Sequence, residues 1–161
     1  MIAAFAVSPV AAAQEAQCDL YKQIIAEAPS GFKAYQDAPI PERPGSFLSN
    51  FQLPGFTCMV SDGPDKVFLC YAMRPNEGVA KIGYLLETAS IRRCFPDWAT
   101  RPPASTYQEG DPITEESIQF FNQIDDAEIS IGVLRAHADT PEKLPHLIGI
   151  GVIWRPLPIG A

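Results

Sequence analysis

Two histidines, His137 and His146, are the side chains of this sequence best suited to acid–base chemistry near neutral pH. With a serine and an acid, either could complete a Ser-His-Asp triad. The Gly-x-Ser-x-Gly motif of many hydrolases is absent from the sequence. Both histidines flank predicted strands, where a histidine is usually a surface or capping residue. We therefore predict no catalytic residue, and retain as an alternative an exported hydrolase that uses His137 or His146.

Four cysteines could bind zinc, act as nucleophiles or form disulfides: Cys18, Cys58, Cys70 and Cys94. Compact zinc sites draw two ligands from one short turn, whereas 39, 11 and 23 residues separate these cysteines and no C-x-x-C motif occurs. A redox motif would also need C-x-x-C. An even number of cysteines in an exported domain instead predicts two disulfides, with three pairings open.

The pairing depends on a predicted hairpin of residues 56–61 and 66–73. A four-residue turn places Cys58 opposite Leu69, so that the sulfurs of Cys58 and Cys70 lie on opposite faces of the ribbon. A turn of three or five residues places Cys58 opposite Cys70. Because the four-residue turn gives the cleaner apolar face, it favours a disulfide from each strand cysteine to a helix cysteine.

The remaining charged residues argue against several classes of protein. The acidic pairs Glu115-Glu116 and Asp125-Asp126 are adjacent in sequence, so in strands their side chains point apart. No glycine-rich phosphate loop follows a strand, and we predict neither a cofactor nor a metal site. The net charge of −7 repels nucleic acid and anionic membrane surfaces.

The first residues have the composition of an export signal. Residues 2–13 are uncharged and almost wholly apolar, and Ala11-Ala12-Ala13 supplies the small residues of a cleavage site. We predict a secretory signal peptide over 1–13 and a single exported α+β domain over 14–161, periplasmic or secreted. No later segment reaches the roughly 20 apolar residues that span a membrane.

The elements that must position these residues follow from their periodicity. Apolar residues at helical spacing predict a helix over 18–28, and Pro29 ends it. Residues 29–55 are rich in proline and aromatic residues and predict a long strap packed on the domain. A second helix is predicted from the cap Asn76 to Cys94. Its expected buried face comprises Val79, Ile82, Gly83, Leu86 and Ala89.

Alternating apolar residues predict further strands over 128–136 and 147–154, and the glycines of the last strand indicate close approach of another group. Residues 113–122 fit a helix or a strand, and we favour a strand over 117–122. The expected fold is α+β: an antiparallel sheet of about five strands with two helices packed on one face, in the order α-ββ-α-βββ, with long proline-rich loops.

The leading functional hypothesis is a non-catalytic exported module that binds a protein partner, such as an inhibitor, an immunity-like protein or an envelope accessory subunit. Trp, Tyr and Arg side chains most often anchor protein contacts. The candidate interface residues are Arg74, Arg92, Arg93, Trp98 and Tyr107. A self-associating structural envelope domain is a further alternative.

Overall fold

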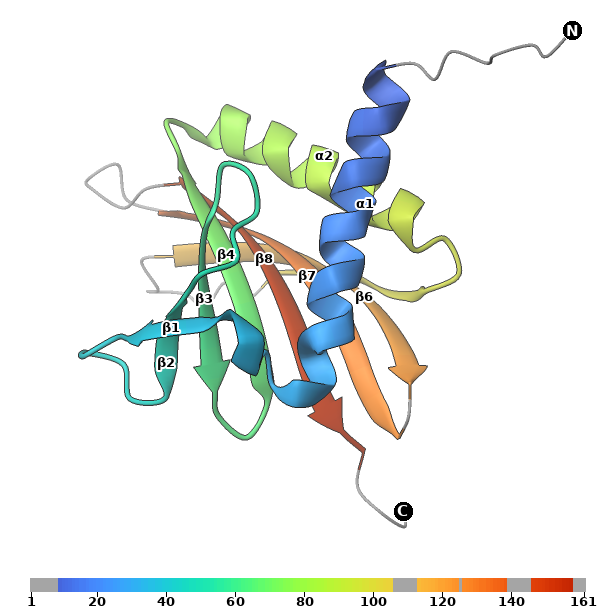
Figure 1. The fold of residues 1–161 in the computed structure, drawn as a ribbon. Helices are drawn as coiled ribbons and strands as arrows, with labels where there is room; N and C mark the ends of the chain where they lie inside the picture. Colours follow the sequence, from blue (N-terminus) through green and yellow to red (C-terminus); the bar gives the residue numbers. More distant parts are fainter. Residues whose placement is uncertain (1–8, 106–112, 125, 139–145, 158–161) are drawn as a thin grey trace, which may run out of the picture.

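A computed structural model of the protein describes residues 9–105, 113–124, 126–138 and 146–157 (Figure 1). Within these residues, one antiparallel sheet of eight strands has the order β1-β2-β3-β4-β8-β7-β6-β5. The helices are α1 (Pro9–Glu27) and α2 (Glu77–Cys94). The strands are β1 (Gln36–Pro39), β2 (Ser46–Ser49), β3 (Thr57–Asp62), β4 (Lys66–Arg74), β5 (Ala99–Ser105), β6 (Ile113–Ile124), β7 (Ala127–Ala138) and β8 (His146–Pro156).

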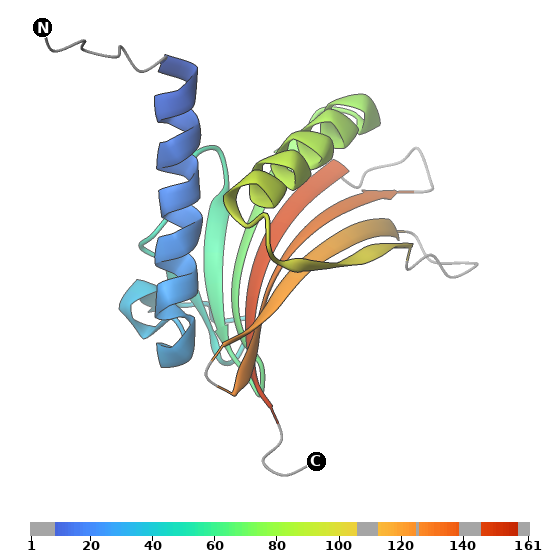
Figure 2. The ribbon, with the colours of Figure 1, turned by 90° about the vertical axis from the view of Figure 1, so that its right-hand side faces the viewer.

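Both helices lie on one side of the sheet, and the other side carries no helix among the described residues (Figure 2). The core between helices and sheet is formed by Tyr21 and Ile24 of α1, Tyr84 of α2, and strand residues such as Phe68 and Phe120. This layering confirms the predicted α+β class. Among the described residues, no helix covers the other face of the sheet, so ligands can reach the protein from that side.

The sheet is larger than the five strands expected, and the element order differs. Two of the additional strands, β1 and β2, lie within the predicted strap of residues 29–55, and β5 lies within a segment expected to be a turn-rich loop. The strap is packed as predicted, because Phe32 is fully buried and its ring lies 5.8 Å from that of Phe68. The ambiguous segment 113–122 belongs to the strand β6.

Helix α1 begins at Pro9, upstream of the predicted start at Cys18, and proline suits a first helical position. Cleavage after Ala13, as the signal-peptide prediction requires, would leave a helix that begins at Gln14 and retains Cys18. Export itself remains a prediction. None of the helices in the described part of the chain has the length and apolarity needed to span a bilayer.

Helix α2 has the predicted ends but not the predicted orientation. The side chain of Asn76 accepts a hydrogen bond from the backbone N–H of Val79, and the last helical residue is Cys94. The buried residues are Ala80, Tyr84 and Ile91. The stripe expected to be buried is exposed instead, except for half-buried Gly83: Val79, Ile82, Leu86 and Ala89.

A close approach to the sheet explains this orientation. A methyl group added at Gly83 would lie 2.2 Å from Cδ1 of Ile148 on β8, so the helix rests on the sheet through its small residues. A larger side chain at position 83 cannot fit into that space, whereas Tyr84 and Ile91 reach the core at other points of the helix. With this side of α2 against the sheet, Val79, Ile82 and Leu86 face solvent.

Two disulfides are present. Cys18–Cys94 joins α1 to α2, and Cys58–Cys70 joins β3 to β4. The favoured strand-to-helix pairing is wrong. Asp62 pairs with Lys66 across the hairpin, which leaves a three-residue turn and places Cys58 directly opposite Cys70. These two cysteines have a Cα–Cα distance of 4.0 Å.

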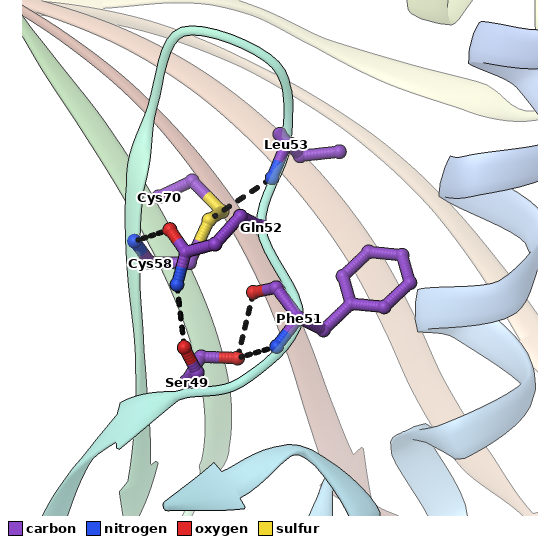
Figure 3. Close-up of a disulfide and its surroundings, with 6 residues drawn as sticks. All are labelled: Ser49, Phe51, Gln52, Leu53, Cys58 and Cys70. Carbon is purple, nitrogen blue, oxygen red and sulfur yellow. Dashed lines mark hydrogen bonds between the residues drawn. A yellow bond between two sulfur atoms is a disulfide. The ribbon is translucent and has the colours of Figure 1, made fainter.

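The strand disulfide is enclosed by the segment that follows β2 (Figure 3). The side chain of Gln52 accepts a hydrogen bond of 2.9 Å from the backbone N–H of Cys58, and the N–H of Leu53 donates to the sulfur of Cys58 at 3.5 Å. Both cysteines are buried. The bond therefore belongs to the core and is shielded from solvent thiols.

Candidate functional site

The uncovered face of the sheet holds an apolar groove with a volume of about 610 Å³. Its walls come from β2, β3, β4, β7 and β8, because alternate residues of each strand point away from the helices. On β4 these are Leu69, Tyr71 and Met73, whereas Phe68 and Cys70 face the core. The volume is within the range of small-molecule sites.

The rim of the groove is formed by the turn between β1 and β2. Backbone hydrogen bonds close this turn, with Ile40 N–H donating to Ser46 at 2.9 Å and Ser46 N–H donating to Arg43 at 3.0 Å. Gly45 adopts a positive φ of 77°, which glycine tolerates at a sharp reversal. The turn directs Arg43 back over the sheet, where Nη1 lies 3.8 Å from the sulfur of Met59.

A second apolar surface is the outward face of α2. The exposed fractions are 60% for Ile82, 55% for Leu85 and 65% for Leu86, and Val79 extends the stripe toward the start of the helix. Residues at i, i+3 and i+7 lie on one side of a helix. We name Val79, Ile82, Leu85 and Leu86 the α2 stripe.

The cations beside the α2 stripe, Lys81, Arg92 and Arg93, form no ion pair with a described carboxylate, whereas both acids of α2 bond to other elements. Glu77 accepts a hydrogen bond of 3.1 Å from Arg135, which holds the pKa of that carboxyl below its ordinary value. Glu87 accepts one of 2.7 Å from the hydroxyl of Tyr21 on α1. Burial, followed by the charge of Glu87, raises the pKa of Tyr21.

The predicted interface residues are not gathered at one place. Arg92 and Arg93 lie in the last turn of α2, where the guanidinium carbon of Arg92 is 6.0 Å from the centroid of the Phe120 ring. Arg74 lies over Phe56, and Trp98 packs against the ring of Phe95 at 4.8 Å. Tyr107 lies outside the described residues. Only Arg92 and Arg93 belong to the same helix as the α2 stripe.

The two histidines are brought together by β7 and β8, with ring centroids 6.4 Å apart. Arg135 lies nearby with 5% of its side chain exposed, between Glu77 and Glu116. Nδ1 of His146 is buried without a hydrogen-bond partner in the described residues. Among the described residues, no hydrogen bond joins either imidazole ring to a serine, so these contacts give neither histidine a serine nucleophile to activate.

Within the described residues, no group of three or more His, Cys, Asp or Glu side chains could hold a metal ion. Glu116 pairs with Arg135 at 2.8 Å, which assigns one of the sequence's paired acids to an ion pair. Comparison of the chain with protein-family models, with curated proteins and with solved structures yields no match. The groove and the α2 stripe are the features on which a function can be argued.

Neither surface was identified from the sequence. The groove requires the pairing of β4 with β8 and of β7 with β8, and strand order cannot be read from local periodicity. The α2 stripe was visible as a periodic apolar pattern and was assigned to the core. The signal that could have distinguished the two faces is residue size, because Ala80 and Gly83 mark the side of closest approach.

Proposed function

We propose that this protein is an exported, non-catalytic binding module that engages a protein partner through the α2 stripe. The observation that supports the proposal most directly is the exposure of Ile82, Leu85 and Leu86, each more than half exposed. Contiguous exposed apolar side chains on a folded domain are typical of an interaction surface. Helical anchors spaced in this way fit an apolar groove on a partner.

The charges around the stripe indicate the chemistry of that partner. Lys81, Arg92 and Arg93 are exposed on the same helix, and none of them forms an ion pair with another described residue. A partner groove with carboxylates at its rim would complement them. A second copy of this chain would bring cations against cations, and both copies carry a net charge of −7. Charge therefore favours a different protein over self-association.

The proposal predicts that Ile82→Asp combined with Leu86→Asp abolishes binding without unfolding the protein. Exposed positions usually change stability by within about 0.5 kcal/mol. At an interface, each centrally placed anchor contributes at least about 2 kcal/mol, so we expect affinity to fall by more than a hundredfold for the pair. Ile124→Asp, on an exposed residue of β6, is the matched control and should bind normally.

The experiment uses photo-crosslinking from position 85 in envelope extracts, followed by identification of the partner and calorimetry with the two purified proteins. Affinity should also fall with added salt, because the cations contribute to encounter. A purified partner that binds the double variant as tightly as the wild type would contradict the proposal. A concentration-dependent mass of the protein alone, lost in Ile82→Asp, would instead support the self-associating alternative.

A further inference from the structure

The groove on the uncovered face extends beyond the space of about 610 Å³ described above, which we call its main hollow. A second hollow of about 280 Å³ adjoins it and shares Leu69 and Leu134 with it. The second hollow continues along the sheet toward β6, between Val67 and Ile153. The lining of the second hollow is apolar apart from Ser117 and Gln119. An elongated channel of this kind suits a chain-like ligand better than a compact one.

Glycines keep the floor of this channel low. The side chain of Leu134 already covers Gly149 of β8, where an added methyl group would be 2.8 Å from Cγ of Leu134, so this glycine lets Leu134 lie close to the sheet. Gly132 of β7 pairs with Gly151 of β8, so two adjacent floor positions carry no side chain. Larger residues at these positions would fill the space between the walls with side-chain atoms.

Charge is present at one place only among the described residues that line the channel. Arg43, on the rim, is the single charged residue of the main hollow, and the remaining lining is apolar apart from Thr57 and Tyr71. In the part of the chain that the structure describes, Arg43 forms no ion pair with a carboxylate, although the protein is acidic overall. Among the described residues, the Arg43 guanidinium has one side-chain hydrogen-bond contact, with the sulfur of Met59 at 3.8 Å, which leaves it free to bind an external anion.

We propose that the channel binds a long-chain monocarboxylate, with the carboxylate at Arg43 and the alkyl chain along Leu69 and Leu134. The guanidinium matches a carboxylate in charge and in its planar geometry. Met73 at the lip is 66% exposed, and methionine adapts its shape to flexible chains. This site is distinct from the α2 stripe, which lies on the opposite side of the sheet, and it does not depend on the proposed protein partner.

The test is calorimetry of the full chain with decanoate below its micelle-forming concentration, compared with 1-decanol and decyltrimethylammonium. Decanoate should bind most tightly, and each methylene removed on the way to octanoate should weaken it about fourfold. Arg43→Gln should weaken decanoate about tenfold and leave 1-decanol unchanged, because only the carboxylate uses the guanidinium. Arg93→Gln, on an exposed α2 arginine, is the matched control and should have no effect.

A second variant tests the position of the alkyl chain. Met73→Asp, at an exposed residue, should fold normally and weaken both decanoate and 1-decanol. Amide resonances of Gly149 and Gly151 should shift on addition of decanoate in the wild type. The proposal would be overturned if neither decanoate nor 1-decanol bound, or if Arg43→Gln bound decanoate as tightly as the wild type does. Tighter binding of decyltrimethylammonium than of decanoate would also overturn it. Binding to phosphatidylglycerol vesicles without binding to decanoate would also overturn it, in favour of a membrane contact.

Discussion

Removing each disulfide separately should show that the two bonds contribute unequally to stability. Cys18–Cys94 joins residues 76 positions apart, whereas Cys58–Cys70 joins residues 12 positions apart. A crosslink stabilises mainly by restricting the unfolded chain, and the restriction grows with loop length. The loop-entropy relation gives about 4.5 kcal/mol for the long loop and about 2.9 kcal/mol for the short one. The variants are the double substitutions Cys18→Ala with Cys94→Ala, and Cys58→Ala with Cys70→Ala.

The burial of the cysteines should reduce the difference between the stability losses of the two variants. Cys58 and Cys70 are 1% and 0% exposed, so their replacement by alanine also removes buried sulfur atoms from the core. The cysteines between the helices are only half-buried. The gap of about 1.6 kcal/mol expected from loop length should therefore narrow, and the helix bond should still contribute more.

Urea unfolding followed by tryptophan fluorescence would measure both variants, with equal slopes showing that the same surface is exposed on unfolding. Hydrogen exchange would show where the backbone amides lose protection, and removal of Cys18–Cys94 should reduce protection most in α1. A greater loss for the strand variant would refute the loop-entropy argument. A loss below about 1 kcal/mol for the helix variant would mean that the unfolded chain is already restricted.

Two further substitutions test individual contacts. Tyr21→Phe removes the hydroxyl that bonds to Glu87 at 2.7 Å and should cost about 1.5 kcal/mol in urea unfolding, whereas Tyr35→Phe, whose exposed hydroxyl bonds to a backbone carbonyl at 3.2 Å, should cost at most about 0.5 kcal/mol. Equal losses of stability in the two variants would contradict the inference that the Tyr21–Glu87 hydrogen bond holds α1 against α2. Arg135→Met removes the group that lowers the pKa of Glu77. Stability from a lowered carboxyl pKa is present above the ordinary value and is lost as pH falls through the lowered one, so the wild type should lose more stability than Arg135→Met between pH 6 and pH 2. Arg93→Met should retain the wild-type pH dependence, and parallel curves for Arg135→Met and wild type would contradict the role of Arg135.

Local signals in the sequence predicted the elements that local forces define. Asn76 caps α2, Cys94 ends it, and the apolar face of α1 is buried at Tyr21 and Ile24. The hairpin was also predicted, but the length of its turn was not. One residue of difference in that turn moved Cys58 from Leu69 to Cys70 and changed the disulfide pairing.

Features that depend on distant residues could not be predicted in the same way. The strands β1 and β2 are four residues each, and their pairing is fixed by contacts with β3 and by the aromatic cluster around Phe68. The predicted orientation of α2 was wrong because apolar residues occur on both sides of the helix. Gly83, where an added methyl group would lie 2.2 Å from Ile148, and the buried Ala80 lie on the side that meets the sheet. The candidate surfaces are consequences of that orientation and of the strand order.

The prolines at the borders of the sheet limit how copies of this protein can meet. The outermost strands are β1 and β5; β1 ends at Pro39, and β5 contains Pro102 and Pro103 where its register shifts. Proline has no N–H to donate, so neither border can readily template another strand. A sheet of eight strands is thereby protected from edge-to-edge polymerisation into fibrils. At high concentration, encounters between molecules are directed to side-chain surfaces, where they can be reversible and selective.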